Sequence, residues 1–353
     1  MPEQFFQSIP ETITVHLGPP DSNAENVTVP FADYVKNVAS SEIYPNWPES
    51  ALRANIYAIT TYALNRIYSE WYPSRGYNFD ITNSTAYDQA FVKDRDIFEN
   101  ISAIVDELFN DYVVRQGTVN PLFTQFCNGT TSTCNGLSQW GTVSLANQGL
   151  TPYEILQRYY GEDINIITNA PVQNIEESYP GAPLGIGDAG NDVEILSEEL
   201  NRISQNYPAI PKISEPLSIF SSDTEAAVRS FQEIFGLPVT GVVDKATWYR
   251  IKRYYAGVKG LAELVSEGVS LQEAELPFER ILRIGSVGTA VALIQYYLNV
   301  IAYFNGNFNL FPINGIYDQA TADAVSVFQQ FYGLTVDGEV GRETWNRLKE
   351  VYR

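Results

Sequence analysis

The sequence predicts an α+β domain followed by two small, mainly α-helical domains of three helices each. A short alternating strand at residues 12–17 precedes two segments with helical periodicity, a combination typical of an α+β fold. Further on, a segment of helix, glycine turn and helix begins near Val228 and recurs near Val325, which indicates two copies of one unit. We therefore place the first domain at residues 1–170, the second at 171–258, and a linker with the third domain at 259–353.

Composition narrows the possible partners. The 353 residues suffice for two or three domains of ordinary size. With 22 basic and 42 acidic residues the net charge is -20, which argues against DNA, RNA or an anionic membrane as a partner. A single histidine cannot build a histidine-based zinc site, so we expect neither a zinc amidase nor a zinc peptidase mechanism. We also expect no metal and no other cofactor.

The N-terminal residues contain no basic segment followed by an apolar run, and no window approaches the length of a membrane span. We therefore expect no export signal and no transmembrane segment. Only about a dozen residues precede the first predicted strand, which argues against activation by removal of a long pro-segment.

The first predicted strand alternates apolar and polar residues. Ile13, Val15 and Leu17 should face the core, while a glycine-proline turn leads to a partner strand at residues 27–29. His16, the sole histidine, then lies on the polar side, and we expect it at the surface.

Glu42 occupies an unusual position for an acid. Pro30 is suited to open a helix whose apolar residues recur at helical spacing, namely Phe31, Tyr34, Val35 and Val38. Glu42 is the next residue on that face, with Ser40 and Ser41 before it. Partial burial there favours the protonated form, which a general acid needs. The alternative is a solvated glutamate at a fraying helix end.

A proline-rich corner from Tyr44 to Pro48 separates this helix from the next. The second helix carries an apolar stripe of Leu52, Ile56, Ile59, Ala63 and Ile67. We expect Ala51, Ala54 and Ala58 on its flank to permit close packing against the first helix, so that Glu42 has a rigid support.

A polar stretch follows, and its residues Asp80, Asp88 and Gln89 are candidates for one wall of a groove. Next, Asp96 and Glu99 predict a capping box for a helix with Ile97 and other isoleucines on one face.

Cys127 and Cys134 are the only cysteines, and the residues alone leave a disulfide and two free thiols equally open. Soon after, glycines flank Ser138, Gln139 and Trp140 and would let the backbone approach a ligand closely. An amide beside an indole is a common pairing in sugar sites, although a tight helix entry with a buried tryptophan would explain the same residues. Thr151 and Glu154 should cap another helix, and residues 164–167 should form a closing strand.

Residues 168–183 predict a linker, after which the two repeats share a phenylalanine-glutamine pair, a glycine-leucine pair and a threonine-tryptophan pair. The aromatic residues of these pairs, Phe231, Trp248, Phe328 and Trp345, are expected in the cores. Binding residues are expected on the loops at 208–222 and 305–318. The first copy has Thr240-Gly241 where Asp337-Gly338 stands in the second, and Asp244 in place of Gly341, so we expect it to bind less well or to act as a spacer.

The segment YVKNVASSEIYPNWPESALRANIYA resembles the stage II sporulation protein D family of lytic transglycosylases, and within it the clostridial spore cortex-lytic enzymes. The resemblance runs from about Ile13 to Ile167 and includes CNGLSQWGTVSLANQGLTPYEILQRYYG. It implies that Glu42 is the catalytic acid. The predicted substrate contacts are Ser40, Ser41, Tyr44, Ser138, Gln139 and Trp140. The repeats resemble the three-helix peptidoglycan-binding domain found beside wall-degrading enzymes.

Two features depart from the resembled family. Its structural zinc ligands would fall near residues 79–87, where this chain has neither Cys nor His, so no metal is expected. The family also commonly has arginine where Thr60 stands.

The resemblance implies cleavage of the β-1,4 bond between N-acetylmuramic acid and N-acetylglucosamine, with a 1,6-anhydro product, in spore cortex during germination or in the wall during sporulation. The expected partner is the peptidoglycan glycan strand, and the expected location is the spore. Two alternatives are a non-catalytic wall-binding spore protein and a muramidase hydrolase that uses Glu42 with Asp80 or Asp88.

Overall fold

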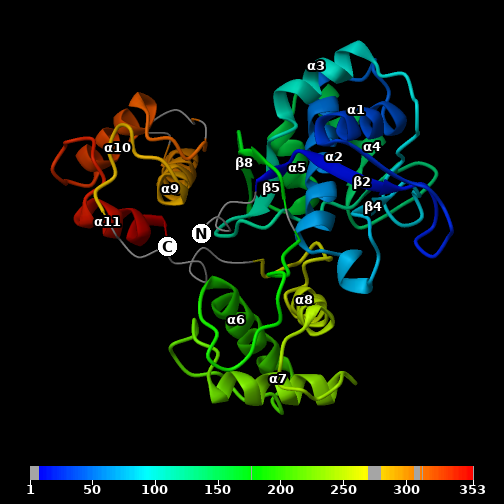
Figure 1. Cartoon of the computed structure of the whole chain (residues 1–353). Coiled ribbons are helices and arrows are strands. Elements are labelled where there is room, and N and C mark those ends of the chain that lie inside the picture. The colour runs from blue at the N-terminus through cyan, green and yellow to red at the C-terminus, as the bar shows by residue number, and fades with distance from the viewer. Residues whose placement is uncertain (1–7, 176, 269–279, 306–310, 312, 353) are drawn as a thin grey trace.

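The computed structural model describes residues 8–175, 177–268, 280–305, 311 and 313–352. It has a mixed α+β N-terminal part and a helical C-terminal part, as predicted. In Figure 1 the N-terminal part lies at the upper right, α6 to α8 lie below it, and α9 to α11 lie to the left. In the described part of the chain, no helix is long and apolar enough to cross a bilayer.

A three-stranded sheet begins the N-terminal part. Strand β2 (Thr12–His16) lies between antiparallel β3 (Asn26–Pro30) and parallel β4 (Ile81–Thr82). A separate pair joins β1 (Ile9–Pro10) to β9 (Val172–Gln173) in parallel. Strand β9 lies within residues 168–183, which were expected to be a linker. The chain therefore returns to pair with β1 before the repeats begin.

The prediction of an exposed His16 is wrong. His16 is only 4% exposed, and its ring stacks on Phe79 with ring centroids 4.6 Å apart. Nδ1 lies 2.6 Å from Asn26 Oδ1, and Nε2 lies 3.1 Å from Ser22 Oγ. The polar face of β2 is covered by a loop more than sixty residues later in the chain, which strand alternation alone does not reveal.

Helices α1 (Phe31–Glu42) and α2 (Glu49–Tyr68) each begin one residue after a proline. The predicted apolar faces are buried, but α2 is buried around most of its circumference rather than along one stripe. Ala54 and Ala58 pack in a cluster with Ile155 of α5 (Pro152–Tyr160), not against α1 as expected. Helix α2 is thus the central helix of this part, and its small residues admit α5.

The other elements of the N-terminal part surround α2. They are η1 (Pro73–Arg75), α3 (Glu99–Leu108), β5 (Tyr112–Arg115), β6 (Phe126–Cys127), β7 (Leu137–Ser138), α4 (Gln139–Asn147) and β8 (Ile164–Ile167). Strands β5 and β8 pair antiparallel, and Thr151 and Glu154 form the predicted capping box of α5. The capping box predicted for α3 is absent, since the helix begins at Glu99 without a side-chain cap and Ile97 is exposed.

Each repeat is a three-helix unit. The first contains α6 (Asn191–Asn206), α7 (Ser222–Ile234) and α8 (Lys245–Val258), and the second contains α9 (Thr289–Asn305), α10 (Gln319–Phe331) and α11 (Arg342–Tyr352). The four repeated aromatic residues named above are buried, as predicted.

The glycine turn has the same bonding in both repeats. Gln232 Oε1 accepts from Thr240 N–H and Gly241 N–H, and Gln329 Oε1 accepts from the corresponding residues of the second repeat. Thr240 thus takes the structural place of an aspartate, and Asp244 caps α8. The sequence differences that suggested a weaker first repeat leave this turn intact.

Candidate active site

Glu42 ends helix α1, and its carboxylate is half-buried and hydrogen-bonded on both oxygens. The Ala90 N–H donates to Oε1 at 2.9 Å, and Gln139 Nε2 donates to Oε2 at 3.2 Å. These donors come from two segments far from α1 in the sequence. Such bonds fix the orientation of the side chain.

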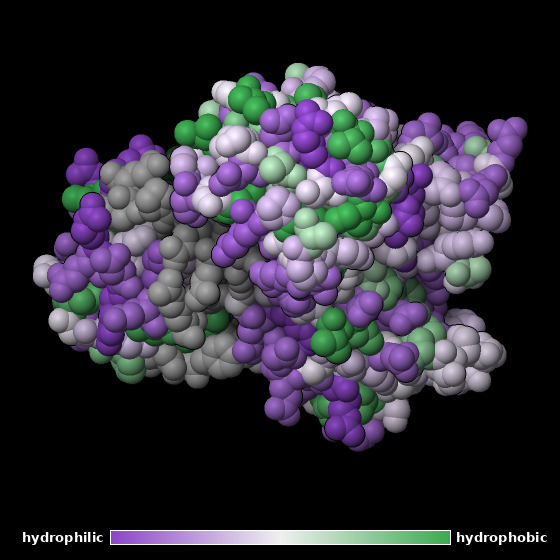
Figure 2. Space-filling model, turned by 90° about the horizontal axis from the view of Figure 1, so that it is seen from below, coloured by the Kyte–Doolittle hydropathy of each residue, from purple (hydrophilic) through white to green (hydrophobic). Residues whose placement is uncertain are grey.

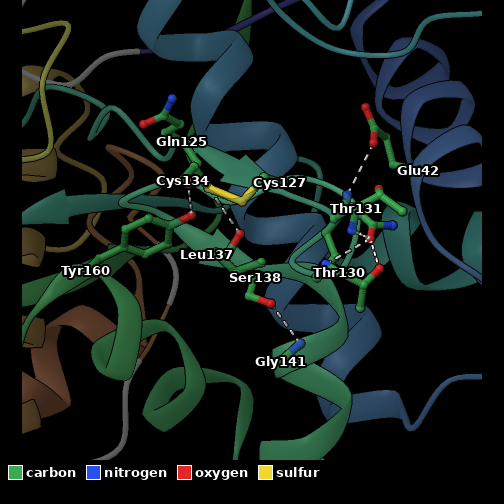
Figure 3. The surroundings of a disulfide bond; sticks show 12 residues. Glu42, Gln125, Cys127, Thr130, Thr131, Cys134, Leu137, Ser138, Gly141 and Tyr160 are labelled. Atoms are coloured by element: carbon green, nitrogen blue, oxygen red, sulfur yellow. Dashed lines mark hydrogen bonds between the residues drawn. A yellow bond between two sulfur atoms is a disulfide. The ribbon is translucent and has the colours of Figure 1, made fainter.

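Gln139 is the first residue of α4 and is only 2% exposed. Ser138, beside it, caps α4 because its Oγ accepts from the Gly141 N–H at 3.0 Å (Figure 3). A Cβ at Gly141 would come within 2.1 Å of the Tyr159 hydroxyl, and one at Gly136 within 1.8 Å of a backbone oxygen. The two glycines therefore permit close approach of the chain to itself, not to a ligand as expected.

A disulfide joins Cys127 to Cys134, which resolves the alternative left open by the sequence (Figure 3). Strand β6 pairs in parallel with β7, and Cys127 lies opposite Ser138 in that register. The disulfide loop is therefore adjacent to the start of α4, where Gln139 contacts Glu42.

Three aromatic residues gather next to this contact. Trp140 lies 4.9 Å from Trp47 and 5.8 Å from Tyr44, measured between ring centroids. They line an open pocket of about 530 Å³, which is also lined by Asn46, Pro48, Val143 and Asn147. Trp140 is 40% exposed and Tyr44 56%, so the buried-tryptophan interpretation does not hold. Glu42 does not line the pocket itself but is two residues before Tyr44 and is bonded to the neighbour of Trp140.

Two of the predicted substrate contacts, Ser40 and Ser41, form hydrogen bonds within the protein. Ser40 is 1% exposed, and its Oγ accepts from the Phe98 N–H at 3.3 Å. Ser41 Oγ donates to the Asn37 carbonyl at 2.9 Å. Both serines thus bond within or beside α1, where they support the helix that carries Glu42.

The acids predicted to form a groove wall are also structural. The Asp88 side chain is fully buried, pairs with Arg66 at 2.8 Å and accepts from Thr82. Asp80 accepts from the Thr14 N–H at 2.7 Å, and burial raises its pKa while that bond lowers it. Gln89 is fully buried and accepts from the Tyr34 hydroxyl. The loop reaches Glu42 through a backbone N–H and not through its acidic side chains.

Two members of the site were not predicted from the sequence. The Ala90 N–H carries no side-chain signal, so only the folded loop reveals it. Trp47 could have been found, because it stands between two prolines in the corner that follows Glu42. Thr60, where the resembled family commonly has arginine, is fully buried in α2.

The geometry provides one oriented carboxylate beside an aromatic pocket. A half-buried carboxyl can exchange a proton with a bound sugar, and aromatic faces with polar edges pack against sugar rings. Among the described residues no three His, Cys, Asp or Glu side chains converge as metal ligands.

The comparisons with known families agree with the two-part organisation. Residues 22–108 match a family described as "Stage II sporulation protein", and residues 189–251 and 287–348 each match the "Putative peptidoglycan binding domain" family. Glu42 lies within the first match, whereas Gln139 lies beyond it.

Similar proteins cover only part of the chain. A probable N-acetylmuramoyl-L-alanine amidase of Bacillus licheniformis is 28% identical over 176 residues, which are 50% of this chain and 47% of that protein. The amidase CwlM of Mycobacterium tuberculosis is 29% identical over 134 residues, 37% of this chain and 28% of its own. The chain spans about half the length, or less, of these relatives. The solved SleB N-terminal domain is 27% identical and covers 21% of this chain and 94% of its own, with a TM-score of 0.19.

Proposed function

We propose that this chain, in which a segment matching the stage II sporulation protein family precedes two segments matching the peptidoglycan-binding family, acts on the cell wall as a peptidoglycan lytic transglycosylase. The observation that carries the proposal is Glu42, a half-buried carboxylate with two fixed donors beside an aromatic pocket. We propose spore cortex or sporulation-stage wall as its substrate and the spore as its location.

In this mechanism one residue serves twice. Protonated Glu42 donates its proton to the glycosidic oxygen between N-acetylmuramic acid and N-acetylglucosamine, and that C–O bond breaks. The 6-hydroxyl of the muramic acid then attacks its own anomeric carbon and gives its proton to the ionised Glu42. The product is a 1,6-anhydro ring, and no water is consumed. Donation from Ala90 and Gln139 suits the ionised state between these steps.

A hydrolase would need a second carboxylate beside the reacting carbon. The two acids that could have supplied it from the neighbouring loop, Asp80 and Asp88, accept hydrogen bonds from the fold, and Asp88 is neutralised by Arg66. This supports the single-acid mechanism over a muramidase that pairs Glu42 with either of them.

The names of the similar amidases suggest a different wall activity, the release of peptides from the glycan. A histidine-ligated zinc amidase needs more than one histidine as metal ligands. This chain has a single histidine, which is buried and hydrogen-bonded to Asn26. We therefore place the similarity to those proteins in wall binding rather than in shared chemistry.

Mass spectrometry of digested cortex and vegetative sacculi tests the proposal. Products one water lighter, with 1,6-anhydro ends, are expected. Reducing ends would indicate a hydrolase, free stem peptides an amidase, and undigested wall with bound protein a non-catalytic protein.

Glu42→Gln supplies the matched test of the residue. We expect a loss of about a hundredfold to ten-thousandfold in rate with wall binding retained. Glu99→Gln, which changes an exposed acid at the start of α3, should leave the rate unchanged. Equal activity of wild type and Glu42→Gln would contradict the proposed role.

A further inference from the structure

Each repeat exposes apolar side chains at the same three positions. In the second repeat they are Ile284, Val287 and Ile316, which we call the aliphatic patch, and they are between 49% and 62% exposed. In the first repeat the corresponding residues are Ile186, Ala189 and Ile219, and its two isoleucines are 65% and 45% exposed. Exposed isoleucines at matching positions in both copies indicate a shared use, because core packing does not require them.

The fold brings these positions together in both repeats. Val287 forms an antiparallel bridge with Ile316, and Ala189 does so with Ile219. In the second repeat the Gly285 N–H donates to the Tyr317 carbonyl at 2.9 Å. This bond ties the turn containing Ile284 to the same bridge. The first repeat has the equivalent bond from Gly187 to Phe220.

We propose that the aliphatic patch binds the stem peptides of peptidoglycan, a proposal that rests on the wall substrate proposed above. The patch contains no aromatic ring to pack on a sugar, whereas alkyl side chains match the alanine methyl groups of a stem peptide. Arg283, exposed beside Ile284, supplies positive charge for stem carboxylates in a chain whose net charge is -20. Sugar recognition is left to the aromatic pocket near Glu42.

The second repeat is the stronger of the two sites. It has Val287 and Arg283 where the first has Ala189 and Gly185. Its loop is also held more firmly, because Gln295 donates to the Ile316 carbonyl at 3.0 Å and accepts from the Gly315 N–H at 2.9 Å. A loop fixed in advance loses less entropy on binding.

Within residues 177–268, the first repeat lacks the two hydrogen bonds that Gln295 makes to its loop in the second repeat. Ser197 stands in the place of Gln295 and is too short to reach, and among the described residues its buried Oγ has no partner. The two repeats therefore differ at this loop and not at the glycine turn.

A second exposed face provides the control. Phe331 and Val336 are 59% and 55% exposed in the same repeat, at the other turn. The corresponding residues of the first repeat, Ile234 and Val239, are also exposed. This face differs between the copies at its edge, where Glu339 in the second repeat replaces Val242 of the first and adds a charge. Replacing this pair removes as much exposed apolar surface as replacing Ile284 and Ile316.

Cosedimentation of the full chain with purified sacculi tests the inference, with Glu42→Gln present throughout to prevent digestion. Ile284→Ser with Ile316→Ser should weaken binding about tenfold, Ile186→Ser with Ile219→Ser about threefold, and Phe331→Ser with Val336→Ser should leave it unchanged. Binding of the parent Glu42→Gln chain to sacculi stripped of stem peptides should fall at least tenfold. All the double variants should keep the parent's thermal unfolding midpoint, since these side chains are exposed.

The inference is overturned if the Phe331 and Val336 pair proves more important, or if stripped glycan binds as tightly as intact sacculi. It is equally overturned if the patch variants only abolish self-association of the chain. Failure of the catalytic proposal is separate, because product ends are measured on the digesting enzyme and binding on the inactive one.

Discussion

Gln139→Leu tests whether the bond between α4 and Glu42 contributes to catalysis. The substitution keeps the side-chain volume of a residue that is 2% exposed but removes the donor to Glu42 Oε2. A hydrogen bond to a charged group contributes about 1.5–3 kcal/mol, and at 3.2 Å this bond is at the long end of the usual range. We take about 1.5 kcal/mol, which predicts a fall in kcat of about tenfold. The Ala90 N–H remains, so the loss should be smaller than that of Glu42→Gln.

The assay is the initial rate of anhydro-product release under saturating substrate. Gln148→Leu, an exposed position at the other end of α4, is the control. The reasoning is refuted if Gln139→Leu keeps the wild-type rate, or if Gln148→Leu causes the same loss.

Three further outcomes follow from the site and its supports. Trp140→Ala should raise KM about tenfold with kcat nearly unchanged, because about 1–1.5 kcal/mol of ring packing is lost, and an unaltered KM would argue against sugar contact at the pocket. Reducing the Cys127–Cys134 disulfide should lower the free energy of unfolding by about 2–3 kcal/mol, seen as a lower melting temperature that Cys127→Ser reproduces without reductant. Burial raises the pKa of Asp111 to about 6, so the folded state holds this proton more tightly and stability should increase as pH falls from about 7 to about 4. Asp111→Asn should therefore stabilise the protein by up to about 3 kcal/mol at pH 7 and by almost nothing at pH 4, and denaturant titrations that find equal effects at both pH values would contradict this.

The local signals in the sequence were sufficient for much of the fold. Helical spacing placed Phe31 to Val38 on a buried face, and proline positions located the starts of α1 and α2 to within one residue. The Thr151 and Glu154 capping box was likewise predicted, because a cap depends on residues three apart. The repeat predicted two three-helix units, since the same core residues recur in both.

Contacts between distant segments account for the wrong predictions. His16 lies on the polar side of its strand, but Phe79 covers it. Ser40 and Asp88 are residue types that are common in binding sites, but each is bonded within the fold. Ser40 accepts a hydrogen bond from the Phe98 N–H, and Asp88 forms an ion pair with Arg66. Periodicity describes one element at a time and does not identify what covers its other face.

By itself the sequence determined that an acid would stand at the end of a helix just before an aromatic corner, and that two similar helical units would follow. Only the tertiary structure decided which groups hold that acid, since Ala90 and Gln139 are 48 and 97 residues from Glu42. The physical reason is that a carboxylate's orientation and solvation depend on the donors packed around it, and those donors arrive through folding of segments far apart in the chain.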